Sequence, residues 1–416
     1  MKKDNSLFMD LSTNEVNILV NSSRGILEKD TLEVSGIKKG EILDQEKFHQ
    51  SFDKPQFLQI LNSYDFEEVI FGVSPSNIFI KQEKCLIFEN NHPRAITEKD
   101  LSNWTNEEGS KSYSDLFVIH SYPLGFLLEG KDSVSNPLGM HARKFEVNEL
   151  KVLIPLDLAN NVSKLSEELD LNCPIYVVSN TMASCQNLVS QENKDFGCYF
   201  INVGDDVTEL AAIHKGKVRY INAIPVGNSN FINDVALALD VTAKEAQLLV
   251  DSYGTITPEL IKEKEVSSLT SKSGNEVRVS NKQVGGIMRA RADELLHIAK
   301  SHFENDLSQD FIANRIVVGG KGAQYKGFES LVKYIFQFFV YGFEYENDKP
   351  QCNIDSLLAM SNGETNMMNP LPSSGIKNNL NQLIPRGYST MVRTTGKLTK
   401  EIIKIFNERV SSGGVK

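Results

Sequence analysis

The stretch CYFINVGDDVTELAAIHKGKVRYI, residues 198–221, carries the pattern on which the fold prediction rests. Apolar residues dominate Cys198–Val203, Glu209–Ile213 and Val218–Ile221, whose lengths are typical of strands. The polar segments Gly204–Val207 and Lys215–Gly216 separate these strands and predict turns. The stretch therefore predicts a strand, a polar turn and a second strand, followed by a further turn and strand.

The beginning of the chain follows the same pattern. Ser6–Asp10 predicts a strand, Ser12–Asn14 a small polar turn, and the alternating apolar residues of Val16–Val20 a second strand. Lys47–Asn62 then has apolar residues at near-helical spacing, interrupted by a proline, and Val69–Val73 predicts a buried strand. A strand-turn-strand unit is thus expected once in each half of the chain.

The segment from about residue 80 to residue 153 has a different arrangement of apolar and polar residues and predicts an inserted α+β subdomain. Its expected elements are a strand at Cys85–Phe88, a helix at Thr97–Glu107, a strand at Leu116–Ile119 and a loop at Asn136–Gly139. After it, Asp157–Leu169 has a helical pattern and Ile175–Val178 predicts a strand that closes the first domain.

The second half continues with helices and a glycine-rich turn. Helices are expected at Phe231–Leu239, Thr242–Ser252 and Lys282–Glu304, where apolar residues recur at helical spacing. Arg315–Val318 predicts a strand that leads into GGKGAQ at Gly319–Gln324. Glycines at such a turn permit close approach of the backbone to a ligand.

The C-terminal part has two different compositions. Residues 347–396 are rich in Asn, Ser, Gly and Pro, which predicts a flexible linker. Residues 397–416 contain a predicted amphipathic helix, Leu398–Val410, in which apolar residues share one face and most charged residues lie on the other.

Composition excludes several classes of protein. The 416-residue chain has a formal net charge of −10, whereas a nucleic-acid surface needs concentrated Lys and Arg, so we expect no nucleic-acid partner. Its five cysteines include no CxxC pair, which argues against a disulfide framework or a structural zinc site. No apolar stretch is long enough for a membrane span or a signal peptide.

Other catalytic arrangements find no support in the sequence. The seven histidines include no HExxH motif, so packing or solvated roles are expected for them. No GxSxG motif occurs, and Ser184 beside Cys185 has no identifiable base. We therefore expect no hydrolytic nucleophile.

Several motifs, in their order and spacing, resemble the FtsA family of bacterial division proteins within the actin and heat-shock ATPase superfamily. They are SGIKKGEILD (residues 35–44), ITEKDL (96–101), NPLGM (136–140), IPVGNSNFINDVA (224–236) and RIVVGGKGAQYKG (315–327). The resemblance covers roughly residues 5 to 335. It implies an α/β, actin-like two-domain ATPase fold with an FtsA-type subdomain inserted in the first domain.

The resemblance also implies domain boundaries. They are 1–79 and 154–190 for the first domain, 80–153 for the inserted subdomain, 191–346 for the second domain with an outer subdomain at about 225–304, 347–396 for the linker, and 397–416 for the C-terminal helix and tail.

In actin-type folds, two hairpins hold the phosphates of a nucleotide through backbone N–H groups, and a carboxylate holds the water shell of the metal. The resemblance therefore implies ATP with magnesium as a candidate cofactor, with Asp10 as the residue for the metal. The implied nucleotide-binding residues are Asp10, Ser12, Thr13, Asn14, Asn202, Gly204, Gly227, Gln247, Gly319, Gly320 and Gly322.

This chain departs from the family pattern at the second hairpin, where NVGDDVTE replaces a sequence close to DIGGGTTD. Asn202 stands in place of a carboxylate, and Asp205 and Asp206 replace glycines, so the site carries charge that repels a triphosphate unless a cation intervenes. Gln247 and Val250 replace a Glu and a Lys that contact the nucleoside in the family. We therefore predict a degenerate ATP site without efficient hydrolysis, in a protein that is not primarily an enzyme.

By resemblance, the chain would polymerise and tether FtsZ filaments to the cytoplasmic membrane, with FtsZ bound around Pro225–Leu296. It would be cytoplasmic and peripheral on the inner face of that membrane, among other division proteins. The expected membrane-binding residues are Leu398, Ile402, Ile405, Phe406 and Val410.

Two other hypotheses remain open. The chain could be a PilM-like scaffold of a pilus or secretion platform, which would need no lipid-binding helix. It could also be an actin-fold ATPase or sugar kinase, although the altered NVGDDVTE and the lack of a sugar-site motif argue against that class.

Overall fold

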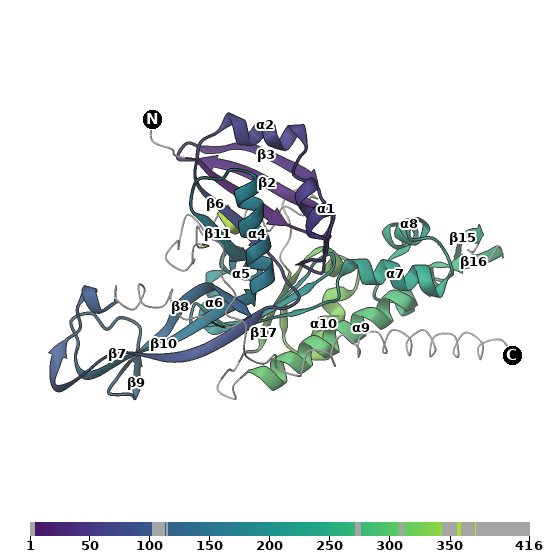
Figure 1. Ribbon diagram of the computed structural model, residues 1–416. Coiled ribbons are helices and arrows are strands. Elements are labelled where there is room, and N and C mark those ends of the chain that lie inside the picture. The colour runs from purple at the N-terminus through teal and green to yellow at the C-terminus, as the bar shows by residue number, and fades with distance from the viewer. Residues whose placement is uncertain are drawn as a thin grey trace.

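The computed structural model describes residues 5–101, 113, 115–270, 276–307, 311, 313–342, 356–358 and 371. Within these residues, each half of the chain contains a five-stranded sheet, and a long antiparallel sheet is inserted into the first half. Figure 1 shows the first sheet at the top of the molecule, the second below it, and the inserted sheet projecting to one side. The predicted α/β architecture with two domains is confirmed.

The first sheet comprises β1 (Asn5–Leu11), β2 (Glu15–Ser22), β3 (Gly25–Glu33), β6 (Phe66–Val73) and β11 (Ile175–Ser179), in the order β11-β6-β1-β2-β3. The first three strands form an antiparallel meander, and β6 and β11 run in the direction of β1. Parallel strands end at the same edge of a sheet, which is where ligands bind in open α/β folds. Asp10, Ser74 and Asn180 consequently lie together at that edge.

The other elements of the first domain are a short hairpin, β4 (Ile37–Lys38) and β5 (Glu41–Ile42), and the helices α1 (Gln45–Gln50), α2 (Pro55–Ser63), α4 (Leu156–Glu168), α5 (Asn180–Leu188) and α6 (Gln191–Phe196). The side chain of Asp44 caps α1 by accepting from the N–H of Lys47. Pro55 occupies the first turn of α2, where its missing N–H costs nothing. The predicted helical segment 47–62 with a break at its proline is therefore confirmed.

The inserted subdomain contains β7 (Phe79–Ala95), β8 (Leu116–Leu128), β9 (Asp132–Val134) and β10 (His141–Pro155), paired in the order β7-β10-β8-β9. β7 and β8 are much longer than the four-residue strands that the sequence predicts there, and β9 and β10 were not predicted. Blocks of polar and charged residues flank the apolar run Cys85–Phe88 in β7, so that run marks only the middle of the strand. The predicted helix Thr97–Glu107 is seen at residues 98–101, and residues 102–112 lie outside the described part.

The second sheet repeats the topology of the first. Its strands are β12 (Cys198–Val203), β13 (Thr208–His214), β14 (Lys217–Ile224), β17 (Arg315–Gly319) and β18 (Phe339–Gly342), in the order β14-β13-β12-β17-β18. Here too a three-strand antiparallel meander is followed by two strands parallel to its first member. The strand-turn-strand unit predicted twice in the sequence is confirmed as the start of each sheet.

The remaining elements of the second domain are α7 (Asn228–Ala238), α8 (Ala243–Tyr253), η2 (Pro258–Leu260), β15 (Glu265–Thr270), β16 (Glu276–Ser280), α9 (Asn281–Asp306), η3 (Lys321–Ala323) and α10 (Phe328–Phe336). The three helices expected from the sequence correspond to α7, α8 and α9. Thr242 caps α8 through a reciprocal pair of hydrogen bonds with Glu245. Figure 1 shows α8 and the β15–β16 hairpin at the end of the molecule opposite the inserted sheet.

The two faces of the first sheet are covered differently. One face packs on α1, α2 and α4, in a buried cluster that continues through Tyr122 of β8 to Phe200 and Val218 of the second sheet. On the other face, Leu357 packs against Phe8 and Ile70.

Part of the predicted linker is therefore packed. Leu357 is 1% exposed, and the N–H of Leu371 donates to the carbonyl of Ile175 at 2.8 Å. The rest of 347–396 beyond β18, and all of the predicted helix 397–416, lie outside the described residues, and the predicted boundaries stay predictions. In the part of the chain that is described, no helix has the length and apolar character needed to cross a bilayer.

Candidate functional site

A cavity lies where the tip of the β1–β2 hairpin faces the tip of the β12–β13 hairpin. Its empty volume, including the open mouth, is about 440 Å³. The residues that line it come from both domains and are Leu11, Ser12, Thr13, Gly40, Ser74, Asn202, Gly204, Asp205, Asp206, Val207 and Glu209. The predicted residues Ser12, Thr13, Asn202 and Gly204 are thus brought together.

The first hairpin presents hydroxyl groups to the cavity and keeps its carboxylate beneath them. Its turn is closed by the N–H of Ser12, which donates to the carbonyl of Glu15 at 3.0 Å. Asp10 is buried, and its oxygens accept from the side-chain amides of Asn180 at 2.9 Å and Asn17 at 3.4 Å. The predicted metal residue is therefore held by amide groups below the cavity lining.

The base of the second hairpin contains a buried, hydrogen-bonded pair of an asparagine and a glutamate. Asn202 and Glu209 lie opposite each other in the β12–β13 register, and the Asn202 amide donates to Glu209 Oε2 at 2.7 Å. Burial raises the pKa of the Glu209 carboxyl, and hydrogen bonds from Asn202, Ser74 and Thr181 only partly offset this effect. Glu209 thus reaches from the second domain to residues of the first.

The glycine-rich turn packs directly against this hairpin. Gly320 has a φ of +91°, and a Cβ there would lie 2.5 Å from both Asn202 Oδ1 and the carbonyl oxygen of Val203. A Cβ on Gly322 would lie 2.4 Å from a methyl group of Val203. Only glycine allows this approach, which explains why the predicted GGKGAQ turn sits at the site. Lys321 Nζ, between these glycines, forms an ion pair with Asp205 Oδ1 at 2.9 Å.

The tip of the second hairpin rests on the first turn of α7. The N–H groups of Asn228 and Ser229 donate to the carbonyls of Gly204 and Asp205, both at 2.8 Å. A Cβ on Gly227 would lie 2.5 Å from the carbonyl oxygen of Asp205. The predicted residue Gly227 therefore acts at the site by permitting this contact.

Among the predicted residues outside the cavity lining, Asn14 and Gln247 make their contacts elsewhere. Asn14 is exposed at the turn, where its carbonyl accepts from the N–H of Val34 at 2.9 Å. The amide of Gln247 donates to Asp251 on its own helix at 2.6 Å. Their nucleotide-binding roles stay predictions.

Sequence reasoning missed several residues that the fold brings to the site, and Ser74, Gly40 and Ser229 are three of them. Ser74 follows β6, Gly40 lies in the β4–β5 turn, and Ser229 lies in the first turn of α7. Gly40 is part of SGIKKGEILD and Ser229 part of IPVGNSNFINDVA, so the motifs marked these regions without indicating the side chains. No local sequence pattern marks Ser74 as a site residue, because only the pairing of β6 with β1 brings it to the cavity.

The charges of the cavity decide how well it fits a nucleotide with magnesium. The hydroxyls of Ser12 and Thr13 suit a phosphate, but Asp205, Asp206 and Glu209 line the same space, and its described lining includes no Lys or Arg. Among the described residues, no group of three or more His, Cys, Asp or Glu is placed to hold a metal ion. Without a cation between them, these carboxylates would repel the phosphates of a nucleotide.

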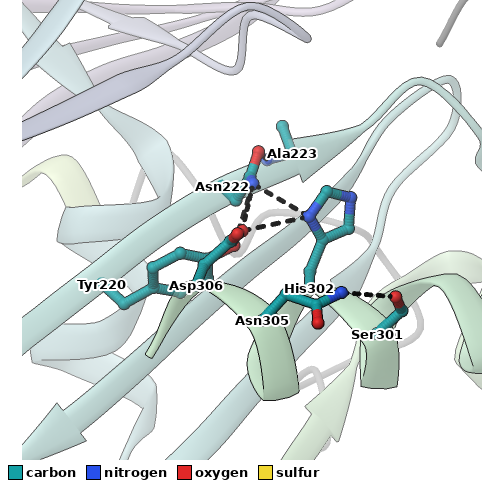
Figure 2. Close-up of polar contacts among 7 residues, drawn as sticks. All are labelled: Tyr220, Asn222, Ala223, Ser301, His302, Asn305 and Asp306. Carbon is teal, nitrogen blue, oxygen red and sulfur yellow. Dashed lines mark hydrogen bonds and ion pairs between the residues drawn. The ribbon is translucent and has the colours of Figure 1, made fainter. Parts of the chain in front are cut away.

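A second polar cluster lies on the second domain, between β14 and the end of α9 (Figure 2). The hydroxyl of Tyr220 donates to Asp306 Oδ2 at 2.7 Å, and His302 Nδ1 lies 3.2 Å from the same oxygen. The amide nitrogen of Asn222 is 2.8 Å from the Tyr220 hydroxyl. These groups satisfy one another, so the cluster joins strand to helix, in keeping with the packing role expected for the histidines.

Paired hairpins facing each other from two domains with one repeated sheet topology define an actin-like fold. Among solved structures, MreB5 of Spiroplasma citri bound to ADP is similar with a TM-score of 0.54 at 14% identity, covering 87% of this chain and 97% of that one. A chain of the PilM–PilN type IV pilus biogenesis complex gives a TM-score of 0.57 at 10% identity, covering 86% and 98%. At these identities the likeness shows the fold alone.

The family model described as cell division protein FtsA matches residues 199–360. FtsA of Enterococcus hirae is 22% identical over 337 residues, which are 79% of this chain and 75% of the relative. FtsA of Bacillus subtilis is 21% identical over 339 residues, which are 79% and 76%. The chain is a divergent FtsA-like protein with an actin-like fold.

Proposed function

We propose that this protein is a cell-division adaptor that polymerises, binds FtsZ and tethers FtsZ filaments to the inner face of the cytoplasmic membrane. The observation that carries the proposal is its similarity to FtsA proteins over 79% of the chain, with the family model matching the second domain. The residues matched by the family model include the second hairpin of the cleft and the outer helices. Other division proteins would be further partners at the same membrane surface.

The outer part of the second domain offers apolar side chains to a partner. Leu237 on α7, Leu248 on α8 and Leu260 in η2 are 58%, 60% and 81% exposed. Exposed apolar residues in a surface helix are typical contacts for a short peptide segment. All three lie within the segment Pro225–Leu296 that we propose as the FtsZ-binding region.

The nucleotide cleft would be degenerate in this adaptor. The two hairpins face each other as an actin-like fold requires, and the MreB5 structures of this fold are bound to ADP and AMPPNP. In this chain the cavity is lined by carboxylates, and the Lys321 ammonium is already paired with Asp205. We expect weak ATP binding and phosphate release at background level, which would also exclude an ATPase or sugar kinase.

Co-sedimentation with lipid vesicles tests the membrane part of the proposal. The full chain and a form that ends at Gly396 are each mixed with FtsZ and vesicles of anionic lipid, with and without ATP and magnesium. We expect the full chain to carry FtsZ into the pellet and the shortened form to leave it in solution. A single amphipathic helix binds lipid weakly, so pelleting should rise with polymerisation.

A variant pair tests the FtsZ surface in the same assay. Leu248→Asp should abolish pelleting of FtsZ while the adaptor itself still pellets, because the charge disrupts an apolar contact. Leu86→Asp, at a half-exposed leucine of the inserted sheet, is the matched control and should change nothing.

Equal pelleting of the full chain and of the form that ends at Gly396, or pelleting of neither, would instead favour a PilM-like scaffold, which needs no lipid helix of its own.

A further inference from the structure

Asp206 connects the two domains across the mouth of the cavity. It lies at the tip of the β12–β13 hairpin in the second domain, and its Oδ2 accepts from the hydroxyl of Thr13 in the first domain at 2.8 Å. The backbone N–H of Lys39, also in the first domain, lies 3.5 Å from the same oxygen. On the other side, Oδ1 accepts from the hydroxyl of Ser229 at 2.5 Å. One carboxylate therefore joins both hairpins, the β4–β5 turn and α7.

Two glycines make this convergence possible. A Cβ on Gly227 would lie 2.7 Å from the backbone nitrogen of Asp206, so any side chain there would push the hairpin tip away. Gly40 has a φ of +69°, and a Cβ on it would lie 2.0 Å from the carbonyl oxygen of Ser74. The backbone around Lys39 can therefore reach the cavity mouth only because residue 40 is glycine.

The groups around Asp206 are those that bind a phosphate. Hydroxyls, a backbone N–H and the N-terminal turn of a helix all favour an anion, and a carboxylate accepts the same hydrogen bonds as phosphate oxygens. The two hairpins that face each other in this fold here close on a side chain of the protein itself. We propose that Asp206 is an internal clasp that takes the place of a phosphate group and keeps the cleft closed without nucleotide.

The neighbouring aspartate has no such role. The ion pair of Asp205 with Lys321 stays within the second domain, and both side chains are half exposed. Asp205 and Asp206 thus have the same charge and adjacent positions at one hairpin tip, but only the bonds of Asp206 link the domains. Asp205→Ala is therefore a matched control for Asp206→Ala.

The test is amide hydrogen exchange of the isolated full chain, read in peptides that cover residues 11–14 and 37–41. In the wild type we expect protection of both segments, unchanged by millimolar ATP and magnesium. Asp206→Ala and Thr13→Val should each raise exchange there about tenfold or more, because each removes a hydrogen bond to a charged group. The double variant should rise no further than Asp206→Ala, since Asp206→Ala already loses the bond that Thr13→Val removes, and Asp205→Ala should match the wild type.

Three results would overturn the clasp: wild-type exchange in Asp206→Ala, an equal rise in Asp205→Ala, or new protection of the wild-type hairpins by ATP. If Asp206→Ala does not fold, Thr13→Val gives the answer alone, because it keeps side-chain shape and charge. The inference goes beyond the proposed division role. The measurement uses neither FtsZ nor lipid, so it can fail while the adaptor function holds, and the reverse is also possible.

Discussion

Glu209 is a buried carboxyl at the junction of the two domains. Burial raises its pKa above the ordinary value of 4.5, so the folded protein binds this proton more tightly than the unfolded chain does. Between pH 4.5 and the raised pKa, the Glu209 carboxyl is protonated in the folded state and ionised in the unfolded state. The contribution of Glu209 to stability is therefore largest at acidic pH and decreases as pH rises from 4.5 through the raised pKa.

Glu209→Gln should remove this dependence. The glutamine oxygen can still accept from Asn202, and no charge remains to be buried. We expect the variant to be more stable than the wild type above the raised pKa and to lose that advantage toward pH 4.5. Urea unfolding over a pH series measures both free energies. A constant difference between the two proteins at every pH would contradict the prediction.

Single residues of the site could be predicted from sequence where a local pattern marks them. The turns around Ser12 and Gly204 follow apolar strands, and their small polar residues indicate a phosphate-type hairpin. The role of Asp206 could not be predicted beyond its repulsion of phosphate, because its partners Thr13 and Ser229 are far from it in the chain. Its bonding depends on how the two domains meet.

Helices α7 and α9 are held together by a buried charged group. The guanidinium of Arg291 donates to both oxygens of Asp234, at 2.5 and 2.9 Å, and also to Glu294 on its own helix. All three side chains are buried. Such a pair is costly to break, because the remaining partners become unpaired charges away from water.

Arg291→Ala should lower the free energy of unfolding by about 3–5 kcal/mol, since Asp234 and Glu294 would be left buried together. Arg289→Ala is the control from the same helix. Arg289 pairs with the more exposed Asp293 at 3.0 Å and donates to the carbonyl of Ile256 at 3.2 Å, and its loss should cost about 1–2 kcal/mol. Urea unfolding at neutral pH compares the two, and equal losses would show that Arg291 contributes no more than a surface pair.

Among the elements, those with a strong local period were predicted well. The apolar spacing of α9 and the proline that begins α2 are visible in the sequence, and both helices lie where expected. Of the inserted strands, β7 and β8 were predicted too short and β9 and β10 were not predicted. Charged residues flank the apolar run of β7, and His, Ser, Pro and Gly interrupt that of β8. Leu357 was assigned to a linker because its neighbours are polar, and only tertiary structure shows that it covers the first sheet.

The architecture of the whole molecule could be predicted because the same unit occurs twice. Two strand-turn-strand units indicated two related sheets, and the order β11-β6-β1-β2-β3 is repeated as β18-β17-β12-β13-β14. The contact between the two domains could not be predicted from either strand-turn-strand unit. The join includes a buried cluster that contains Val162 of α4, Tyr122 of the inserted sheet and Phe200 of the second sheet.

This shared core predicts that the two domains unfold together. Besides apolar contacts, the Tyr122 hydroxyl donates to the carbonyl of Val218 at 2.8 Å, and Lys217 Nζ donates to that of Pro123 at 2.7 Å. These bonds link the inserted sheet to β14, so opening one domain would expose part of the core of the other. We expect one thermal transition in which the calorimetric and van't Hoff enthalpies agree.

Tyr122→Phe makes the prediction specific. It removes a buried donor and should lower stability by about 1–3 kcal/mol, because the Val218 carbonyl loses a partner at the join. If the domains are coupled, the single transition moves to lower temperature as a whole, and core amides of both sheets exchange faster by the same factor. If they are independent, the wild type already shows two transitions, or the variant accelerates exchange in only one sheet. Either of these results would mean that the continuous core does not couple the two halves.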